Sequence, residues 1–376
     1  MVASAPLPPL LSRAAAVAAG RDLALPCRLA LNDGSELVLL KALRILPARR
    51  LVAEARWQGR PVLAKIFLDH DATRHARREA DGLGKLAAAG LPTPALLAAL
   101  NSTDGAAVLL TEWLSGAQTL AQRTTSRHDS CPDAEDAQAT FELIGRLHAA
   151  GLIHADLHPG NLLHHAGRWY LIDADAIRPA GSADYLDNLA LYLAQFTGPT
   201  APSATDALPA YRRGRAPGTR ASTALADEAS LPARVEAARA RRLQRYLEKT
   251  ARECTRFIVR RSLSRFAVLR RSEAGWLAPL VNEPDRWLAQ GQRLKSGRSA
   301  TVARVYAKGH DCVIKRYNLK NLVHAASRAL RPTRAWHAWH EAHRLAFLGI
   351  PTPAALAVVE ERLGPLRRQA WLITAW

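Results

Sequence analysis

The segment His154-Ala-Asp156-Leu-His158-Pro-Gly-Asn161 places a carboxylate and an amide five residues apart in one short loop. The apolar run Trp169-Tyr-Leu-Ile then leads into a second carboxylate, Asp173. Phosphoryl transfer needs one carboxylate to orient the attacking hydroxyl, and an Asn and an Asp to hold Mg²⁺ on the phosphates of ATP. The spacing therefore predicts the catalytic and metal-binding loops of a kinase-type phosphotransferase with ATP and Mg²⁺ as cofactors.

Each polar residue of these loops receives an expected role. Asp156 is the candidate catalytic base, because a carboxylate there can align the acceptor hydroxyl with the γ-phosphate. Asn161 and Asp173 are the candidate metal ligands. Asp175 is a rival to Asp173, since the sequence runs Asp-Ala-Asp without a following Phe-Gly. Asp173 is preferred because the apolar strand leads straight into it.

The histidines of the loop have two different expected roles. His158 lies two residues beyond the base and is a candidate catalytic donor to the transferring phosphate. A purely structural role is the alternative for this residue. His154 is expected to brace the loop by hydrogen bonds rather than to take part in the chemistry.

Upstream of the loop, the pattern predicts a small sheet with one helix. Strands are expected within 23–46, around a turn at Asn32-Asp33-Gly34, and within 50–67. A helix is predicted from about Ala72 to Ala89, ended by Gly90 and Pro92. The apolar run 107–111 predicts a further buried strand. This is the element order of a kinase N-lobe.

Lys65 and Glu79 supply an expected nucleotide-binding pair. Lys65 lies in the apolar strand 62–67, where an ammonium is costly unless it is paired. Glu79 follows 14 residues later on the predicted helix, which suits an ion pair that positions the α- and β-phosphates. The residues after the last strand, Glu112 to Leu114, correspond to a kinase hinge, so Glu112 and Leu114 are expected beside the nucleotide.

The expected phosphate-covering loop lacks its usual glycines. No G-x-G-x-x-G precedes Lys65, and Leu46-Pro-Ala-Arg49-Arg50 occupies that place. Glycines allow the backbone to approach phosphates closely, so their loss weakens the argument for an ATP site. Arg49 and Arg50 are candidate phosphate contacts, with a solvated turn as the alternative.

Downstream sequence predicts a helical lobe and then a basic region. Helices are expected over 135–151 and 184–196, and the Pro- and Gly-rich stretch 197–218 predicts a loop or boundary. The arginine-rich stretch 234–271 predicts a long helical region with an apolar stripe. This region is either an interfacial helix facing anionic lipid or a solvated linker helix.

The chain also repeats part of itself. Residues 86–95 recur as 345–354, both ending in Pro-Thr-Pro-Ala, and 62–67 recur as 312–317, with Lys315 in the place of Lys65. The end of the chain, 373–376, matches 110–113. We expect Glu341 to correspond to Glu79. These matches in one order predict a duplicated N-lobe without a C-lobe, either because the chain is truncated or because the half-domain is a docking surface.

Composition limits the class of protein and its partners. The chain has 376 residues, 48% hydrophobic and 23% charged, which is typical of two globular domains. The formal charge of +19 favours anionic partners, although no nucleic-acid module accompanies it and no nucleic acid is expected. The four cysteines are far apart and predict neither a metal site nor a disulfide framework. No membrane-spanning stretch or signal peptide is recognised.

With these residues in place, the chain resembles the lipopolysaccharide core kinases, the Kdo and heptose kinases of Gram-negative bacteria. The resemblance rests on Lys65, Glu79, the 92–94 segment, the 154–161 loop and Asp173. It implies an α+β, protein-kinase-like two-lobed fold followed by a second kinase-like N-lobe. The expected divisions are 1–37 (extension with first strands), 38–112 (N-lobe), 113–218 (C-lobe), 219–285 (basic helical linker or C-lobe extension) and 286–376 (incomplete second N-lobe).

The same resemblance implies a function. The reaction would be Mg²⁺-ATP-dependent phosphorylation of a heptose or Kdo hydroxyl of the lipopolysaccharide core oligosaccharide–lipid A. The protein would be cytoplasmic, peripheral to the anionic cytosolic face of the inner membrane. A non-catalytic kinase-like scaffold and another small-molecule or atypical kinase are the alternatives.

Overall fold

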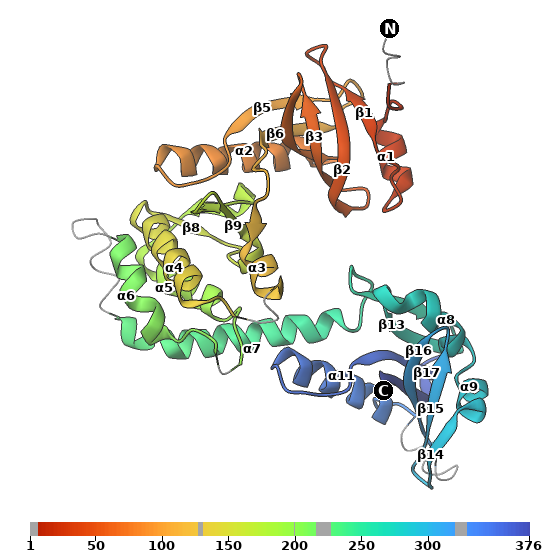
Figure 1. Cartoon of the computed structure of the whole chain (residues 1–376). Helices are drawn as coiled ribbons and strands as arrows, with labels where there is room; N and C mark the ends of the chain where they lie inside the picture. Colours follow the sequence, from red (N-terminus) through yellow and green to blue (C-terminus); the bar gives the residue numbers. More distant parts are fainter. Residues whose placement is uncertain (1–6, 127–130, 199, 216–226, 320–328) are drawn as a thin grey trace. The chain divides into compact units, whose positions relative to one another are not determined.

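The chain forms two compact units, Met1–Glu236 and Ala237–Trp376. The computed structural model describes residues 7–126, 131–198, 200–215, 227–319 and 329–376, and Figure 1 shows the elements they form. Within the described part of the chain, no helix combines the length and apolar character needed to cross a membrane.

The first unit begins with a six-stranded antiparallel sheet in the order β1-β2-β3-β4-β6-β5. The strands are β1 (Cys27–Ala30), β2 (Glu36–Leu46), β3 (Arg50–Trp57), β4 (Arg60–Phe67), β5 (Leu96–Asn101) and β6 (Ala107–Glu112). Helix α2 (Ala72–Ala88) packs on β4, β5 and β6. The predicted strands and helix are confirmed, whereas β5 and the short helix α1 (Arg13–Ala19) were not predicted.

Helices dominate the second part of this unit, as the kinase-like two-lobed prediction requires. They are α3 (Leu120–Ser126), α4 (Ala134–Ala149), α5 (Ser182–Leu193) and α6 (Ala204–Arg215). Helix α6 lies where the sequence predicts a loop or boundary, with Pro209 inside it, and residues 199 and 216–218 of that stretch lie outside the described residues. The prediction of a loop over 197–218 is therefore wrong for most of its length.

Two small sheets in this lobe carry the candidate catalytic segments. Strand β8 (Leu152–His154) pairs with β11 (Ile177–Pro179), and β9 (Leu162–His165) pairs with β10 (Arg168–Leu171) and β7 (Gln118–Thr119). Asp156 lies between β8 and β9, in the loop that ends with the short helix η1 (Pro159–Asn161). Asp173 follows β10 and caps the short helix η2 (Ala174–Ala176). Each segment therefore follows the end of a strand that is paired in a small sheet.

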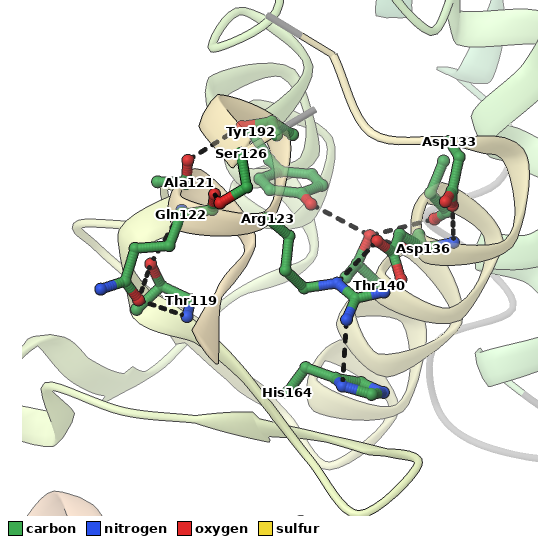
Figure 2. A network of polar contacts seen from close by, with 12 residues as sticks. Thr119, Ala121, Gln122, Arg123, Ser126, Asp133, Asp136, Thr140, His164 and Tyr192 are labelled. Atoms are coloured by element: carbon green, nitrogen blue, oxygen red, sulfur yellow. Dashed lines mark hydrogen bonds and ion pairs between the residues drawn. The ribbon is translucent and has the colours of Figure 1, made fainter. Parts of the chain in front are cut away.

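A polar network holds α3 and α4 against the β9 strand (Figure 2). Arg123 on α3 donates from Nε and Nη2 to the two carboxylate oxygens of Asp136, at 2.9 and 3.0 Å. Its Nη1 lies 3.4 Å from Nδ1 of His164 on β9. Tyr192 donates to Thr140, which in turn donates to the carbonyl oxygen of Asp136. Bidentate Arg–carboxylate geometry is among the stronger polar contacts in proteins, so this network fixes the lobe behind the catalytic loop.

The second unit is built on a seven-stranded sheet in the order β12-β13-β17-β18-β16-β15-β14. Its strands are β12 (Phe257–Arg261), β13 (Arg265–Arg270), β14 (Gln292–Ser296), β15 (Ala300–Ala307), β16 (His310–Tyr317), β17 (Ala355–Leu363) and β18 (Leu366–Ala375). Helix α11 (Arg334–Phe347) packs on β16, β17 and β18, while α8 (Ala274–Asn282) packs on β13 and β17, and α9 (Pro284–Gln290) packs on β15 and β16.

The two sheets share one arrangement of strands. The order β14-β15-β16-β18-β17 repeats β2-β3-β4-β6-β5. In the chain, α2 lies between β4 and β5, and α11 lies between β16 and β17. Lys65 and Lys315 both take the sixth position of their strands, β4 and β16. The second sheet differs by the two added strands, β12 and β13, beyond β17.

The basic region is not one helix. Helix α7 (Leu231–Lys249) ends well before Arg271, and the chain then forms β12 and β13. The helical prediction is therefore wrong beyond Lys249. Strand β13 pairs with β17, so part of the segment expected as a linker (219–285) contributes strands to the second sheet.

Candidate active site

Lys65 on β4 connects two carboxylates. Its Nζ lies 2.5 Å from Oε1 of Glu79 on α2 and 2.8 Å from Oδ1 of Asp173. The side chains of Lys65 and Glu79 are buried, which makes the partners necessary because an unpaired buried ammonium is costly. The ion pair expected from the sequence is present, and Asp173 joins it as a third member from the other lobe.

Glu79 also holds the loop that carries Asp173. Its carboxylate accepts hydrogen bonds from the backbone amides of Ala174, at 3.1 Å, and Asp175, at 3.3 Å. Asp173 itself has φ 60° and ψ 55°, a left-handed conformation that is uncommon for a residue with a side chain. The contacts that Glu79 makes to the next two amides stabilise this conformation.

The charges around Lys65 set the protonation of the site. Burial alone would raise the pKa of Asp173, but the positive charges of Lys65, Arg50 and Arg44 outweigh it and lower the pKa to about 2. Burial would lower the pKa of Lys65, and the two carboxylates outweigh it and raise that pKa. The pKa of Asp175 is raised by burial and by its acidic neighbours, Asp173 and Glu79. At neutral pH, Asp173 is ionised and suited to hold a cation.

The catalytic loop is braced as the sequence predicts. The backbone amide of Asp156 donates to Nδ1 of His154, at 3.3 Å, so the ring proton lies on Nε2, which donates to the carbonyl oxygen of Ile172 at 3.0 Å. Asn161 donates from Nδ2 to the carbonyl oxygen of Asp156, at 2.9 Å. The amide oxygen of Asn161 is thereby the atom left to face a metal.

Asp156 and His158 lie at the exposed end of the site. The Asp156 side chain is 73% exposed, and its Oδ2 lies 3.7 Å from Nε2 of His158. Nδ1 of His158 accepts a hydrogen bond from the backbone amide of Gly160, at 3.0 Å. Burial lowers the pKa of His158, although the charge of Asp156 opposes the shift. His158 is therefore a neutral ring at pH 7 with its proton on Nε2, next to the candidate base.

A second layer of polar contacts behind the loop was missed by the sequence analysis. Asn188 donates from Nδ2 to the carbonyl oxygen of His154, at 2.8 Å, and its Oδ1 lies 3.1 Å from Nε2 of His148. Nδ1 of His148 lies 2.9 Å from the Tyr211 hydroxyl, to which Arg215 donates. Burial lowers the pKa of His148 to about 3, so the ring is neutral. The only sequence signal was a histidine on the apolar face of a predicted helix.

A pocket of about 370 Å³ joins most of these groups, a size typical of small-molecule sites. Six of the eight residues predicted for the site line it: Lys65, Glu79, Glu112, Leu114, Asn161 and Asp173. Asp156 and His158 do not line it. Arg44 and Arg50 do, at the place where glycines were missing, and Arg50 lies 3.7 Å from Asp173. Arg49 pairs instead with Asp69. Arg44 was not predicted, because nothing in the sequence separates it from other exposed strand arginines.

The residues present fit a divalent cation. Asn161 and Asp173 offer the oxygen ligands that Mg²⁺ prefers, and the contacts of Lys65 and Arg50 to Asp173 are both made at Oδ1. Carboxylate oxygens of Glu79, Asp173 and Asp175 also lie within 4.8 Å of one another. The oxygens of Glu79 are already engaged by Lys65 and two backbone amides. Asp175 therefore remains a candidate third ligand, and Glu79 does not.

Part of the first unit, with many of the residues that line this pocket, matches a known family. Residues 64–183 match the model of the lipopolysaccharide kinase (Kdo/WaaP) family. The match includes Lys65, Glu79, Asp156, Asn161 and Asp173, and with them the elements that form the kinase-like site.

Individual relatives match only parts of the chain. A 3-deoxy-D-manno-octulosonic acid kinase of Xanthomonas axonopodis pv. citri is 40% identical over 89 residues, 23% of this chain and 34% of the relative. A probable bifunctional tRNA threonylcarbamoyladenosine biosynthesis protein of Methanothermobacter thermautotrophicus is 29% identical over 132 residues, 32% of this chain and 23% of the relative. The chain thus spans about a third or less of these relatives. A solved structure titled "WaaP in complex with acyl carrier protein" aligns with a TM-score of 0.40 at 21% identity, covering 54% of this chain and 88% of that one.

Within the described residues of the second unit, Lys315 forms no ion pair like that of Lys65. The expected counterpart of Glu79, Glu341, is exposed and pairs with Arg344. Counting back from the shared Pro-Thr-Pro segments places Ala338, not Glu341, at the position of Glu79. Lys315 lies 4.9 Å from the ring centre of Tyr317. The expected correspondence of Glu341 to Glu79 is therefore wrong.

Proposed function

We propose that this protein is a Mg²⁺-ATP-dependent kinase that phosphorylates a sugar hydroxyl, Kdo or heptose, of the lipopolysaccharide inner core. The observation that carries the proposal is the contact of Lys65 with both Glu79 and Asp173, in one pocket with Asn161. Such a linked arrangement of lysine and two acids across two lobes is the one that kinases need. The family of the 64–183 segment and its similarity to 3-deoxy-D-manno-octulosonic acid kinases support the substrate class.

Each residue has a defined part in the proposed reaction. Lys65, oriented by Glu79, binds the α- and β-phosphates of ATP, while Arg44 and Arg50 supply further positive charge in place of a glycine-rich loop. Asn161 and Asp173 would hold Mg²⁺, which neutralises phosphate charge when bound. Glu112 and Leu114 lie along the adenine end of the pocket.

Asp156 is proposed to align the acceptor. Its carboxylate accepts the hydrogen bond of the sugar hydroxyl and turns the oxygen toward the γ-phosphate. Its exposure suits a large acceptor that approaches from outside the nucleotide pocket. Neutral His158, with its proton on Nε2, would donate a hydrogen bond to the transferring phosphate. We infer that the reaction takes place at the cytosolic face of the inner membrane, and the charge of +19 supports this, because it favours a phosphorylated glycolipid and an anionic membrane surface.

Transfer of labelled γ-phosphate from ATP to Kdo–lipid A or heptosylated core acceptors tests this function. We expect transfer by the wild type and a loss of about 10³-fold in kcat for Asp156→Asn, with ATP affinity retained. Asp81→Asn, a change of an exposed carboxylate on α2, is the matched control and should leave kcat unchanged.

The scaffold alternative predicts a different outcome from the same material. Stabilisation by Mg²⁺-ATP without transfer to any core acceptor would favour a non-catalytic nucleotide-binding protein. Transfer to another small alcohol instead would retain the kinase and overturn the acceptor.

A further inference from the structure

The second unit contains a basic pocket that the proposed kinase reaction does not use. It has a volume of about 350 Å³ and lies where the end of α7, the start of β12, the end of β13 and α11 meet. Its polar lining consists of Tyr246, Thr255, Arg256, Arg270, Ser272 and His343. All six belong to Ala237–Trp376, so the pocket is complete within one unit.

The two arginines bring positive charge to this pocket without a matching carboxylate. Among the described residues, neither Arg256 nor Arg270 forms an ion pair, and no acid lines the pocket. Arg256 lies 5.9 Å from the ring centre of Tyr246. The nearby Glu253 pairs with the structural Arg271.

One further acid lies within range of Arg270. Glu273 is close enough for the charge of Arg270 to help lower its pKa, behind the larger effects of Trp276 and Ser272. Its two oxygens accept hydrogen bonds from Trp276, at 2.8 Å, and Ser272, at 3.0 Å. Glu273 therefore does not neutralise the pocket by a direct contact to either lining arginine.

His343 adds a buried polar atom with an unfilled hydrogen bond. Its side chain is 1% exposed, and Nδ1 lies 3.0 Å from the Tyr246 hydroxyl. Nε2 is buried and has no hydrogen-bond partner within the described residues. Buried polar atoms are nearly always partnered in native proteins, and an exception calls for a missing ligand or water.

Burial and the positive charges around the pocket both affect the pKa of His343. Burial lowers the pKa of His343 to about 3, and the charges of Arg270, His340 and Arg256 act in the same direction. The ring is therefore neutral, and with Nδ1 accepting from the Tyr246 hydroxyl its Nε2 carries the proton. The Ser272 hydroxyl donates to Glu273. The donors left in the pocket are two guanidiniums, the Thr255 hydroxyl and the imidazole, a set that matches the acceptor oxygens and charge of a phosphate.

We propose that the pocket formed by Arg256, Arg270, Tyr246 and His343 binds the phosphate group of a small phosphorylated ligand. The pocket is larger than one phosphate, which leaves room for the organic group that carries it. A soluble phosphomonoester and the headgroup of a phosphomonoester lipid offer the same chemistry. The site is separate in sequence and in lining residues from the nucleotide pocket of the first unit.

Binding of two probes to the full chain distinguishes these sources. Glycerol 3-phosphate is titrated by calorimetry, and vesicles of phosphatidylcholine with or without phosphatidic acid are tested by co-sedimentation, all at constant ionic strength. Arg270→Gln should weaken binding of at least one probe by about tenfold or more, because a charge-assisted contact to phosphate is lost. Loss only for the vesicles assigns the headgroup, and loss for glycerol 3-phosphate assigns the soluble ester.

Two further variants keep this test decisive. Arg256 is exposed, so Arg256→Gln should fold normally and should also weaken binding. Arg252→Gln removes the same charge from an exposed residue outside the pocket, and its affinity should stay within about twofold of the wild type. Equal affinities for all three variants, or no binding of either probe by the wild type, would overturn the proposal.

Discussion

Asp173 is the residue whose charge connects the two lobes of the first unit. Its folded-state pKa of about 2 lies below the value of about 3.9 expected for an unfolded chain. Ionised Asp173 therefore contributes stability that is fully present above about pH 4 and is lost as the pH falls through about 2. The linkage between pKa and stability makes this contribution about 2 kcal/mol, and the contact with Lys65 is the main favourable cause.

We predict that Asp173→Asn lowers the free energy of unfolding by about 2 kcal/mol at pH 7. The difference from the wild type should shrink as the pH is lowered from 4 toward 2, because the wild-type carboxyl then takes up its proton. Urea unfolding of both proteins at several pH values measures this difference. A gap that stays constant over that range would show that Asp173 does not titrate with the depressed pKa.

The residues of the site were predictable to different degrees. Lys65, Glu79, Asn161 and Asp173 were identified because their chemistry demands rare residue types at characteristic spacings. Arg44 was not, because no local pattern separates it from the other exposed arginines of the strands. The hydrogen-bonded set from Arg215 to His154 was not predicted for a related reason, since its members come from α4, α5, α6 and strand β8, which are distant in sequence.

At the scale of elements, α2 must approach η2 closely for Glu79 to reach two of its amides. Gly82 makes this approach possible, because a Cβ at that position would lie 1.9 Å from the carbonyl oxygen of Ala174. A Cβ at the neighbouring Gly84 would have no atom within 4 Å. One helix thus carries two glycines, of which only one is required by packing.

We predict that Gly82→Ala destabilises the protein by about 1–3 kcal/mol, because backbone must move to admit the methyl group. The shift should also separate Glu79 from η2 and reduce Mg²⁺-ATP binding. Gly84→Ala is the matched control and should stabilise by about 0.5–1 kcal/mol, since Ala favours a helix. Chemical unfolding and nucleotide titration measure the two effects. Equal behaviour of the two variants would contradict the proposed contact.

The pairing of α3 with α4 allows a second test at this scale. A double-mutant cycle of Arg123→Gln and Asp136→Asn should give a coupling of about 1–3 kcal/mol, because the bidentate contact is largely buried. The more exposed pair of Arg74 on α2 and Asp71, the residue before that helix, should give less than about 0.5 kcal/mol in the same experiment. Coupling energies of equal size would show that the contact of Arg123 with Asp136 stabilises the lobe no more than an exposed ion pair does.

Sequence patterns located most elements, but they failed where the apolar residues of a strand continue the helical spacing of the preceding helix. The strands of the first sheet and helices α2, α4 and α5 follow clear apolar repeats. Phe257 and Ile258 were assigned to a helix because they continue the spacing of Leu243 and Leu247 on α7. Strand pairing with β13, and of β13 with β17, decides the outcome. A contact nearly 100 residues away in sequence has no local signal.

At the scale of the whole molecule, the two units share a strand order but not a chemistry. In the first, Lys65 is held between Glu79 and Asp173. In the second, Lys315 has an alanine, Ala338, at the matching helix position, and it lies against Tyr317 instead. Among the described residues of the second unit, no acid forms an ion pair with Lys315, in contrast to Lys65.

We therefore predict that the two lysines differ in their effect on nucleotide binding by the full chain. Lys65→Met should abolish the rise in Tm that saturating Mg²⁺-ATP gives, since a ligand stabilises only through the folded state that binds it. Lys315→Met should leave this rise and the phosphate transfer unchanged. A Lys315→Met protein with reduced nucleotide affinity would assign a nucleotide site to the second unit as well. If Lys65→Met instead keeps its affinity for Mg²⁺-ATP, the nucleotide does not bind at Lys65 in the first unit. Comparison of the two variants therefore shows which unit binds the nucleotide.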